Sequence, residues 1–461
     1  MARGGPAVGS RIRVEAGRWT AAGEAQCAVD GVEVRVRGLI PGEAADVTIT
    51  HRSRGGPVAW GTVDAIARAD AGRREAPCPL EGTCGGCGLQ HAAEEARLRH
   101  LVDSRTAELP GSLRAALAPE DEWIRSPGFG WRHKAVFLPR WRDGLELGGF
   151  ARGTHDVVDQ PECQVLAPAI RAARDALRDA FAPRGREGLM LRPPGAAPGP
   201  GLRALVVRAN RAGEVLVTAV VRDAGAAAVA TEVLAALADG ASALRAGELV
   251  GAHVQICDAS GDRVHGNEPA RRVAGAARLT ETVGGVGLPV LPLAFFQVNP
   301  WVLEGLVQQL RVEAAGASGI LDAYCGVGAL GIAVAAGLDP RPRLWGFDVV
   351  GAGVEEARRR AADAGLEADY RIGAFGIVDG VQPDVAIVDP PRKGCGPAAI
   401  TALLESRPKT LLYVSCHAAS LGRDTARIEE LGYTATTLWP ADMLPQTGHL
   451  ELLARFDLQT G

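Results

Sequence analysis

The stretch ILDAYCGVGALG, Ile320–Gly331, decides the fold of the C-terminal part of the chain. An apolar run of strand length ends there in a glycine-rich turn, and a helix-forming run follows. Glycines in such a turn let the backbone approach a bound nucleotide closely. Cys325 lies inside the turn, where we expect it to be a packed small residue. Many Rossmann-like folds contain this pattern, so the stretch alone leaves NAD and S-adenosylmethionine open as ligands.

Three further apolar runs, RLWGFD, VAIVD and LLYVS, come later in the chain and alternate with helix-forming segments. Each run fits a buried strand of a parallel sheet, so residues 291–461 are expected to form a Rossmann-like α/β domain. Asp348 ends RLWGFD, twenty residues after Gly328. An acid at that position accepts hydrogen bonds from ribose hydroxyls, so we place Asp348 in a nucleotide site.

The segments VDPPRKG, Val388–Gly394, and YVSC, Tyr413–Cys416, each lie where one of these strands ends. In open α/β sheets, ligands and reacting groups gather at the carboxyl ends of the strands. Asp389 is therefore a site candidate, and Cys416 is placed for thiolate chemistry. The start of the following helix is expected to lower the pKa of the Cys416 thiol. A buried structural cysteine is the alternative interpretation at this point.

The segment FFQVNP, Phe295–Pro300, precedes this sheet. Asn299 is predicted to cap a helix that has Pro300 at its first position. Gln297 is then left as a polar side chain that faces a site. A helix start with no further role is the simpler interpretation of the segment.

The sequence CPLEGTCGGC places Cys78, Cys84 and Cys87 within ten residues, with two glycines between the last pair. Three thiols so close make poor core packing, and the glycines let the backbone fold round a ligand. Cys163, the next cysteine, fits as a fourth ligand. Three clustered thiolates with a distant fourth favour an iron–sulfur cluster over zinc, which more often uses two close pairs. Zinc and unligated cysteines are the alternatives.

Residues 10–67 alternate apolar and polar side chains in short runs, as in VEVRVR at Val32–Arg37. Several short strands in so few residues predict a small antiparallel barrel. Its arginines are interspersed with acids, so an RNA-binding face and an ordinary solvated face are both open. The same two interpretations apply to WRHK, Trp131–Lys134, with Arg140 and Arg142 after it.

The 461 residues suffice for two to four domains at roughly 100–200 residues each. We expect a β-barrel over residues 1–69, a central α+β domain with the cysteine site over 70–290 and the Rossmann-like domain over 291–461. The net charge of −4 excludes binding of nucleic acid by overall charge, so any RNA contact must come from local patches. No run approaches the ~18 apolar residues of a membrane span. We expect a cytoplasmic protein without a disulfide framework.

Six motifs in this order make the chain resemble the S-adenosylmethionine-dependent RNA uracil-C5 methyltransferases, essentially from end to end. The motifs are CPLEGTCGGCGLQH, FFQVNP, DAYCGVG, DPPRKG, YVSC and DMLPQTGHLE. The barrel before them, with its LIPGE turn, looks like a TRAM domain. The resemblance implies a methyltransferase fold in the C-terminal domain. It also implies an enzyme that methylates carbon-5 of a specific uridine in RNA.

The resemblance assigns roles to residues of this chain. Cys416 is implied as the nucleophile that attacks carbon-6 of uracil. Glu451 is implied as the general base that removes the carbon-5 proton, although its position alone would favour a solvated acid at a strand edge. The S-adenosylmethionine and uracil site is implied to include Gln297, Tyr324, Asp348 and Asp389. A [4Fe-4S] cluster is implied on Cys78, Cys84, Cys87 and Cys163.

Three positions depart from the family pattern. His417-Ala418 stands where Asn-Pro commonly follows the nucleophile. Asp348 stands where Glu is common, and Asp363 stands where Asn is often found. None of these changes removes a chemical role. His417 raises the question of how the loop beside Cys416 is held.

Family members with both a TRAM domain and the cluster usually act on large-subunit ribosomal RNA, whereas members that act on the T-loop of transfer RNA usually lack both. We therefore expect 23S rRNA as the substrate, no membrane partner and a monomer, with a tRNA T-loop uridine as the alternative. A nicotinamide-dependent iron–sulfur oxidoreductase would explain the cysteines and the glycine turn, but not Cys416 and Glu451. Those two residues also disfavour an RNA-binding protein without catalysis.

Overall fold

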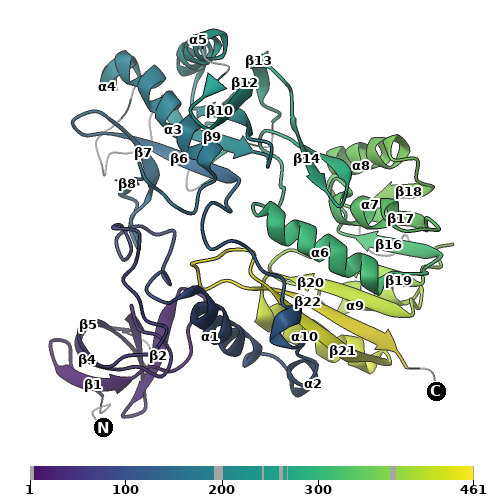
Figure 1. Ribbon diagram of the computed structural model, residues 1–461, viewed down its shortest axis with the longest axis horizontal. Helices are drawn as coiled ribbons and strands as arrows, with labels where there is room; N and C mark the ends of the chain where they lie inside the picture. Colours follow the sequence, from purple (N-terminus) through teal and green to yellow (C-terminus); the bar gives the residue numbers. More distant parts are fainter. Residues whose placement is uncertain are drawn as a thin grey trace.

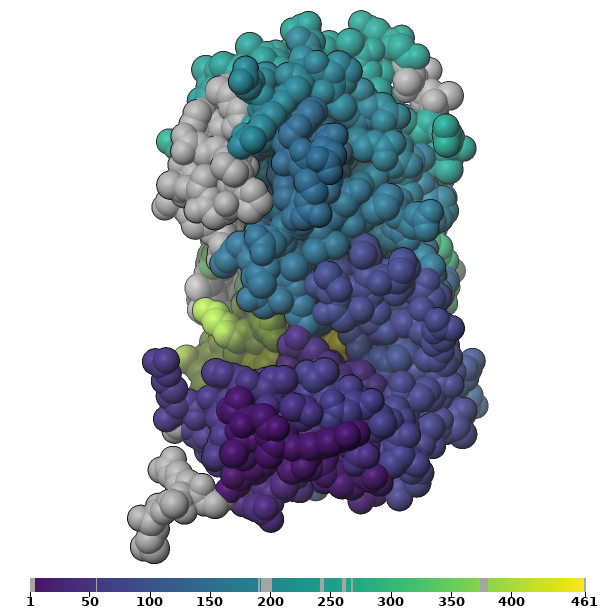
Figure 2. Space-filling model, turned by 90° about the vertical axis from the view of Figure 1, so that its left-hand side faces the viewer, coloured from purple at the N-terminus to yellow at the C-terminus, as the bar shows by residue number. Residues whose placement is uncertain are grey.

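The computed structural model describes residues 5–459 except 55, 190, 192–200, 241–242, 259–262, 267 and 374–379. Three large sheets organise the described chain, and each lies in its own part of the molecule (Figure 1). In Figure 2, C-terminal residues in green and yellow are visible between the purple N-terminal part and the blue central part. No helix among the described residues is long and apolar enough to cross a membrane.

The N-terminal sheet has the strand order β1-β4-β5-β3-β2. Apolar side chains alternate inward along its strands, because successive residues of a strand point to opposite faces. The prediction of a purely antiparallel arrangement is wrong for one pair: β3 runs parallel to β5, because the chain reverses direction both before and after β4. The strands are β1 (Arg11–Glu15), β2 (Glu24–Val29), β3 (Val32–Arg37), β4 (Ala44–Arg52) and β5 (Val58–Arg68).

Three short helical elements join this sheet to the C-terminal one. The segment that contains these helices pairs with the outer edge of the C-terminal sheet. There the N–H groups of Ala118 and Ile124 donate to the carbonyls of Leu438 and Pro440, both at 2.9 Å. The sequence carries no signal for this pairing, since it consists of backbone hydrogen bonds between distant segments. The elements are α1 (Glu94–Thr106), α2 (Gly111–Ala115) and η1 (Glu120–Glu122).

The central sheet has the order β11-β12-β10-β9-β6-β7-β8, with β13 added to β12. Helices α3 and α5 cover one face of it. Strands β9 and β10 form an antiparallel pair. The strands are β6 (Lys134–Trp141), β7 (Leu145–Phe150), β8 (Val157–Asp159), β9 (Leu202–Ala209), β10 (Glu214–Val221), β11 (Ala243–Leu244), β12 (Gly247–Ile256) and β13 (Arg271–Gly275). The helices are α3 (Pro168–Phe181), η2 (Ala182–Arg184), α4 (Gly185–Gly188) and α5 (Ala224–Gly240).

A hairpin and one helix lead into the C-terminal sheet. They are β14 (Leu279–Val283), β15 (Val286–Val290) and α6 (Pro300–Glu313). The predicted start of α6 is confirmed: Asn299 is the N-cap, its side chain accepts from the N–H of Val302, and Pro300 follows it. The Asn299 amide also donates to Ser126 Oγ at 2.8 Å and to the carbonyl of Met443 at 3.1 Å, so it joins three segments.

The C-terminal sheet has the order β18-β17-β16-β19-β20-β22-β21. The first five strands are parallel, and four of them, β17, β16, β19 and β20, are the strands that the sequence predicts; the last two strands are antiparallel. The strands are β16 (Gly319–Ala323), β17 (Arg343–Asp348), β18 (Ala368–Ile372), β19 (Val385–Val388), β20 (Thr410–Ser415), β21 (Tyr433–Ala441) and β22 (Glu451–Leu458). The helices are α7 (Ala329–Ala336), α8 (Gly351–Asp363), α9 (Pro397–Leu404) and α10 (Ala418–Glu430).

Candidate active site

The strand order places four of the predicted site residues along one edge of the C-terminal sheet. Tyr324, Asp348, Asp389 and Cys416 end or follow the parallel strands β16, β17, β19 and β20. The strand order changes direction at β16, and such a switch point is where open α/β sheets bind ligands. In Figure 1 this edge faces the N-terminal and central parts of the molecule.

Glu451 reaches the same edge because its strand runs in the opposite direction. Strand β22 pairs antiparallel with β20, and Leu452 lies opposite Ser415. The first residue of β22 therefore lies beside the end of β20, where Cys416 follows. This pairing brings together two residues that are 35 positions apart in the sequence (451 − 416).

The loop before Glu451 is held by N-terminal segments. The carbonyl of Gln446 accepts hydrogen bonds from the N–H groups of Gly88 and Leu89, at 2.9 and 3.2 Å. Gly448 has no room for a side chain, because a Cβ there would lie 2.7 Å from the carbonyl oxygens of Thr20 and Ala21. Asp442, at the start of the loop, forms a buried ion pair with Arg97 of α1.

The glycine turn after β16 is closed by Asp348. The N–H of Gly326 donates to one carboxylate oxygen at 3.0 Å, and the N–H of Val350 donates to the other at 2.8 Å. Tyr324 and Gly328 have φ values of 60° and 74°, a backbone conformation that a turn this tight requires. Cys325 is buried, as predicted for a packing residue. The predicted nucleotide turn and its acid thus lie together.

Asp389 and Glu451 form a pair of carboxyl groups at this edge. Glu451 is only 7% exposed. Burial raises the pKa of Asp389 well above its usual range, and the hydrogen bond from the Gln297 side chain opposes that shift. Burial, and then the charge of Asp389, raise the pKa of Glu451. A carboxyl with a raised pKa is suited to taking up a proton near neutral pH.

The Cys416 thiol is exposed beside this pair. Burial, followed by the charges of Glu451 and Asp389, raises its pKa to about 11, against the opposing effect of Arg392. The sequence-based expectation of a lowered pKa is therefore wrong for the protein without substrate. A helix N-terminus contributes about 0.3–1 kcal/mol, which is less than one pKa unit, whereas desolvation and two carboxylates act in the opposite direction.

His417 holds the loop beside Cys416 by capping α10. Its Nδ1 accepts from the N–H of Ser420 at 3.3 Å and lies 2.9 Å from Ser420 Oγ. The Ser420 hydroxyl donates to the carbonyl of Arg392 at 2.8 Å. His417 thus supplies the acceptor that an asparagine N-cap would supply. Through Ser420 it also joins α10 to the DPPRKG loop.

Asp424 is a positioning residue that the sequence analysis missed. It is 4% exposed and accepts from the N–H groups of Cys395 and Gly396, at 2.7 and 3.1 Å. It also accepts from the Tyr413 hydroxyl at 2.7 Å. Ser420 and Asp424 lie four residues apart on one face of α10, and this spacing after a capped helix start was the available signal.

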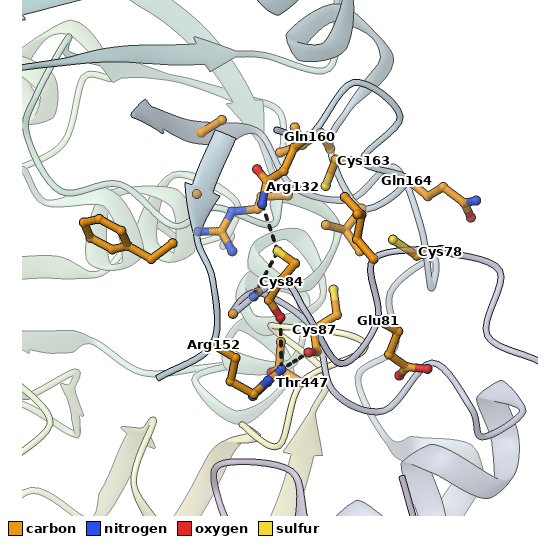
Figure 3. Close-up of a pocket in the computed structure, with 18 of the residues that line it drawn as sticks. Cys78, Glu81, Cys84, Cys87, Arg132, Arg152, Gln160, Cys163, Gln164 and Thr447 are labelled. Atoms are coloured by element: carbon orange, nitrogen blue, oxygen red, sulfur yellow. Dashed lines mark hydrogen bonds between the residues drawn. The ribbon is translucent and has the colours of Figure 1, made fainter. Parts of the chain in front are cut away.

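The four predicted ligand cysteines line one cavity of about 560 Å³, and their sulfur atoms face one another across it (Figure 3). Cys78, Cys84 and Cys87 come from the loop between β5 and α1, and Cys163 comes from the loop between β8 and α3. The Gln160 amide donates to Cys84 Sγ at 2.9 Å. We call this space the cysteine cavity.

The described residues include no group of three or more His, Cys, Asp or Glu side chains that could hold a metal ion. A single ion needs its ligand atoms within about 2.3 Å, and the cysteine cavity is far wider than that. The predicted metal site is therefore not confirmed as it stands. What the structure shows is four thiols around a space large enough for a group of several atoms.

The remaining lining of the cysteine cavity is suited to negative charge. Trp131 Nε1 and Arg152 Nε are buried there without a hydrogen-bond partner. Arg132 lines the cavity as well, and its charge interacts favourably with the cysteine thiolates. Burial raises the pKa of Cys87 to about 12, and mutual repulsion with the other three cysteines adds to the shift. Thiolates at this place need a positively charged ligand.

The comparisons with known proteins agree with this arrangement. An uncharacterized RNA methyltransferase of Thermosynechococcus vestitus is 32% identical over 91% of this chain and 92% of its own length. Another from Listeria monocytogenes is 30% identical over 86% of each chain. The crystal structure of the Pyrococcus abyssi tRNA (uracil-54, C5)-methyltransferase with S-adenosyl-L-homocysteine superposes with a TM-score of 0.73 at 22% identity, over 96% of this chain and 99% of that one. No protein-family model matches.

The fold is that of the superposed methyltransferase, over nearly the full length of both chains. The chain belongs to the family of RNA methyltransferases represented by these relatives. This membership removes the alternative of a nicotinamide-dependent oxidoreductase.

Proposed function

We propose that the protein transfers a methyl group from S-adenosylmethionine to carbon-5 of a uridine in RNA. One observation carries the proposal: an exposed thiol, Cys416, lies beside the buried carboxyl group of Glu451 and the partly buried one of Asp389, at the ligand-binding edge of a methyltransferase sheet. A nucleophile next to a general base is what methylation at carbon-5 of uracil requires, because that carbon is too weak a nucleophile to react unaided.

Each step uses a residue of this edge. The Cys416 thiolate adds to carbon-6 of uracil, and the electron pair of the ring double bond becomes available at carbon-5. S-adenosylmethionine, when bound, supplies the methyl group that carbon-5 takes. Glu451 then accepts the proton of carbon-5, the double bond forms again and the thiolate leaves carbon-6. The raised pKa of Glu451 makes it an effective proton acceptor near neutral pH.

The cofactor site is proposed at the glycine turn, with Tyr324 and Asp348 on one side and Gln297 and Asp389 on the other. Asp348 already orders the turn through Gly326. The Gln297–Asp389 hydrogen bond fixes the second carboxylate between the turn and Cys416. The titration of Asp389 and Glu451 as a pair allows one proton to be held between them during the reaction.

We further propose that the cysteine cavity holds a [4Fe-4S] cluster on Cys78, Cys84, Cys87 and Cys163. The unpartnered N–H groups of Trp131 and Arg152 and the charge of Arg132 fit a sulfide-containing, electron-rich group. Methyl transfer moves no electrons, so the role proposed for the cluster is structural or RNA-orienting. The hydrogen bonds of Gly88 and Leu89 to the loop of Glu451 support the structural role.

For the substrate we propose 23S rRNA, because the five-stranded N-terminal sheet and the cysteine cavity match the features that imply a ribosomal target. The alternative is a uridine of the tRNA T-loop, favoured by the activity named for the superposed Pyrococcus abyssi enzyme. Mapping 5-methyluridine in rRNA and tRNA from a strain that lacks the protein distinguishes the two. The lost modification identifies the substrate, and unchanged maps in both RNAs contradict the proposed function.

RNA that carries 5-fluorouridine tests the chemistry directly, because fluorine at carbon-5 cannot leave as a cation and the adduct is trapped. We expect the wild-type protein with S-adenosylmethionine to form a covalent complex that survives denaturation. Cys416→Ala should form none, while Cys395→Ala, a change of the neighbouring thiol, should still form it. An adduct with Cys416→Ala would assign the nucleophile elsewhere.

A further inference from the structure

Two positive side chains lie side by side on neighbouring strands of the central sheet. Lys134 of β6 lies directly opposite Arg208 of β9 in an antiparallel pair. Side chains directly opposite each other point to the same face, with their Cβ atoms about 4.5–5.5 Å apart, and like charges in that relation destabilise a sheet. We call these two residues the Lys134–Arg208 pair. The pair therefore lowers the stability of the sheet, and local packing does not explain its presence.

No carboxylate among the described residues offsets the charge of this pair. Arg208 is 2% exposed, and its guanidinium donates only to the backbone carbonyls of Pro292 and Ala294. Lys134 forms no ion pair within the described chain, and its neighbours are Arg208 and Arg132. Burial, together with the charges of Arg208 and Arg132, lowers the pKa of Lys134 to about 8. A bound anion would offset the repulsion between the two positive charges.

Several other basic side chains that the sequence offered as RNA-facing are already paired with acids. Arg140 forms an ion pair with Glu146. In the N-terminal sheet, the pairs are Arg13–Asp46, Arg35–Glu33, Arg37–Glu24 and Arg68–Glu15. Paired arginines attract a polyanion less than unpaired ones. The Lys134–Arg208 pair differs from these paired arginines, because neither of its members has an ion pair within the described residues.

The pair adjoins the segment that carries Gln297. The N–H of His133, the residue before Lys134, donates to the carbonyl of Val298 at 2.8 Å. Arg208 holds the same segment at Pro292, at 3.1 Å. Within it, Phe295 is 76% exposed, and Gln297 reaches Asp389. An anion on the pair would thus lie next to the residues that line the proposed uracil site.

We propose that the Lys134–Arg208 pair binds a backbone phosphate of the RNA next to the target uridine. This inference rests on the proposed function and names the part of the substrate that the central sheet recognises. Phosphate contacts fix the position of a nucleic acid without reading its sequence. A phosphate held here would set the distance from the RNA backbone to Cys416 and leave the base free to leave its stack.

The test is the salt dependence of binding to a short fluorescent single-stranded RNA that contains uridines. Each phosphate contact contributes about 0.7 to the slope of log affinity against log salt concentration. Lys134→Met should lower the slope by about that amount and weaken binding several-fold at low salt. The matched control is Lys409→Met, since Lys409 is an exposed lysine already paired with Asp384 at 2.8 Å. It should leave the slope unchanged.

Folding is controlled by the melting temperature. Lys134→Met removes a like-charge contact, so its melting temperature should equal or exceed that of the wild type. RNA with neutral methylphosphonate linkages should bind the wild type and Lys134→Met equally. An unchanged slope in Lys134→Met, or an equal loss of affinity for the neutral RNA, overturns the proposed phosphate site.

The two proposals fail in different assays. Binding with the expected slope change but without formation of 5-methyluridine would contradict the proposed function and leave an RNA phosphate site. Formation of 5-methyluridine with unchanged binding in Lys134→Met would contradict the phosphate site and leave the proposed function intact. With methylation intact, Lys134→Met should raise KM and leave kcat unchanged, because a phosphate contact is made equally in the ground state and the transition state.

Discussion

Cysteines occupy two places of opposite electrostatic character in this molecule. Cys416 is exposed and lies beside the carboxyl groups of Asp389 and Glu451. The thiols of the cysteine cavity lie beside Arg132 and the N–H groups of Trp131 and Arg152. Without a ligand, thiolates are disfavoured at both places, but only the cysteine cavity has a lining that would stabilise a bound, electron-rich group. The difference fits the two proposed roles, a thiolate that forms for one reaction step at Cys416 and thiolates that hold a ligand in the cavity.

The largest effect is expected from removing one thiol in each place. Cys84→Ser should lose bound iron, with its visible absorbance, and should unfold at a lower temperature, because buried thiolates lose their ligand. Cys416→Ser should keep iron and melting temperature and lose methyl transfer. Iron analysis, melting curves and incorporation of labelled methyl groups measure the three properties. Full iron content in Cys84→Ser would contradict the proposed difference between Cys416 and the cysteine cavity.

The next effect concerns the base. Glu451→Gln removes the proton acceptor, so turnover should fall by about 10²–10⁴. The methylated adduct should then accumulate as a protein–RNA complex, visible as a band of lower mobility in a denaturing gel. Rapid turnover without an adduct would assign the base to another residue.

The same variant allows a stability control with a defined sign. The pKa of Glu451 is raised in the folded protein, so the native state binds its proton more tightly than the unfolded chain. This contributes stability that is full below the ordinary Glu pKa of about 4.3 and is lost as pH rises toward the raised value. Glu451→Gln has no such loss. Above neutral pH its free energy of unfolding should therefore exceed that of the wild type.

The smallest effect is a shift of the pH profile. In the proposed reaction, removal of the carbon-5 proton needs deprotonated Glu451, so kcat should fall with decreasing pH from near neutrality, well above the usual range of a glutamate. Asp389→Asn removes the negative neighbour that raises the pKa of Glu451. The acidic limb of its residual activity should move to lower pH. A profile that stays in place would show that the two carboxyl groups do not interact.

The sequence predicted the parallel strands of the C-terminal sheet and the cap at Asn299, because both leave local patterns. It placed Cys416 and Asp389 at strand ends, and the strand order then brought them together. The pKa of Cys416 could not be predicted, since it depends on Glu451, which arrives through an antiparallel strand.

Contacts between distant segments could not be predicted from the sequence. The parallel pairing of β3 with β5 and the attachment of Ala118 to Leu438 consist of backbone hydrogen bonds, which any residue type can make. The Lys134–Arg208 pair is visible only once the register of β6 and β9 is known. Side chains reveal periodicity, but pairing partners follow from topology.

The hydrogen bonds of Gln446 make a loop near the C-terminus depend on residues near the N-terminus. The side chain of Gln446 also donates to Glu94, 352 positions earlier, at 3.0 Å. The loop before Glu451 is therefore shaped by residues that a ribosome makes first and completed by residues that it makes last. A chain shortened at its N-terminus would keep Cys416 and the glycine turn but release the loop that positions Glu451. Such long-range closure also slows folding, because the ends must meet before the loop gains its contacts.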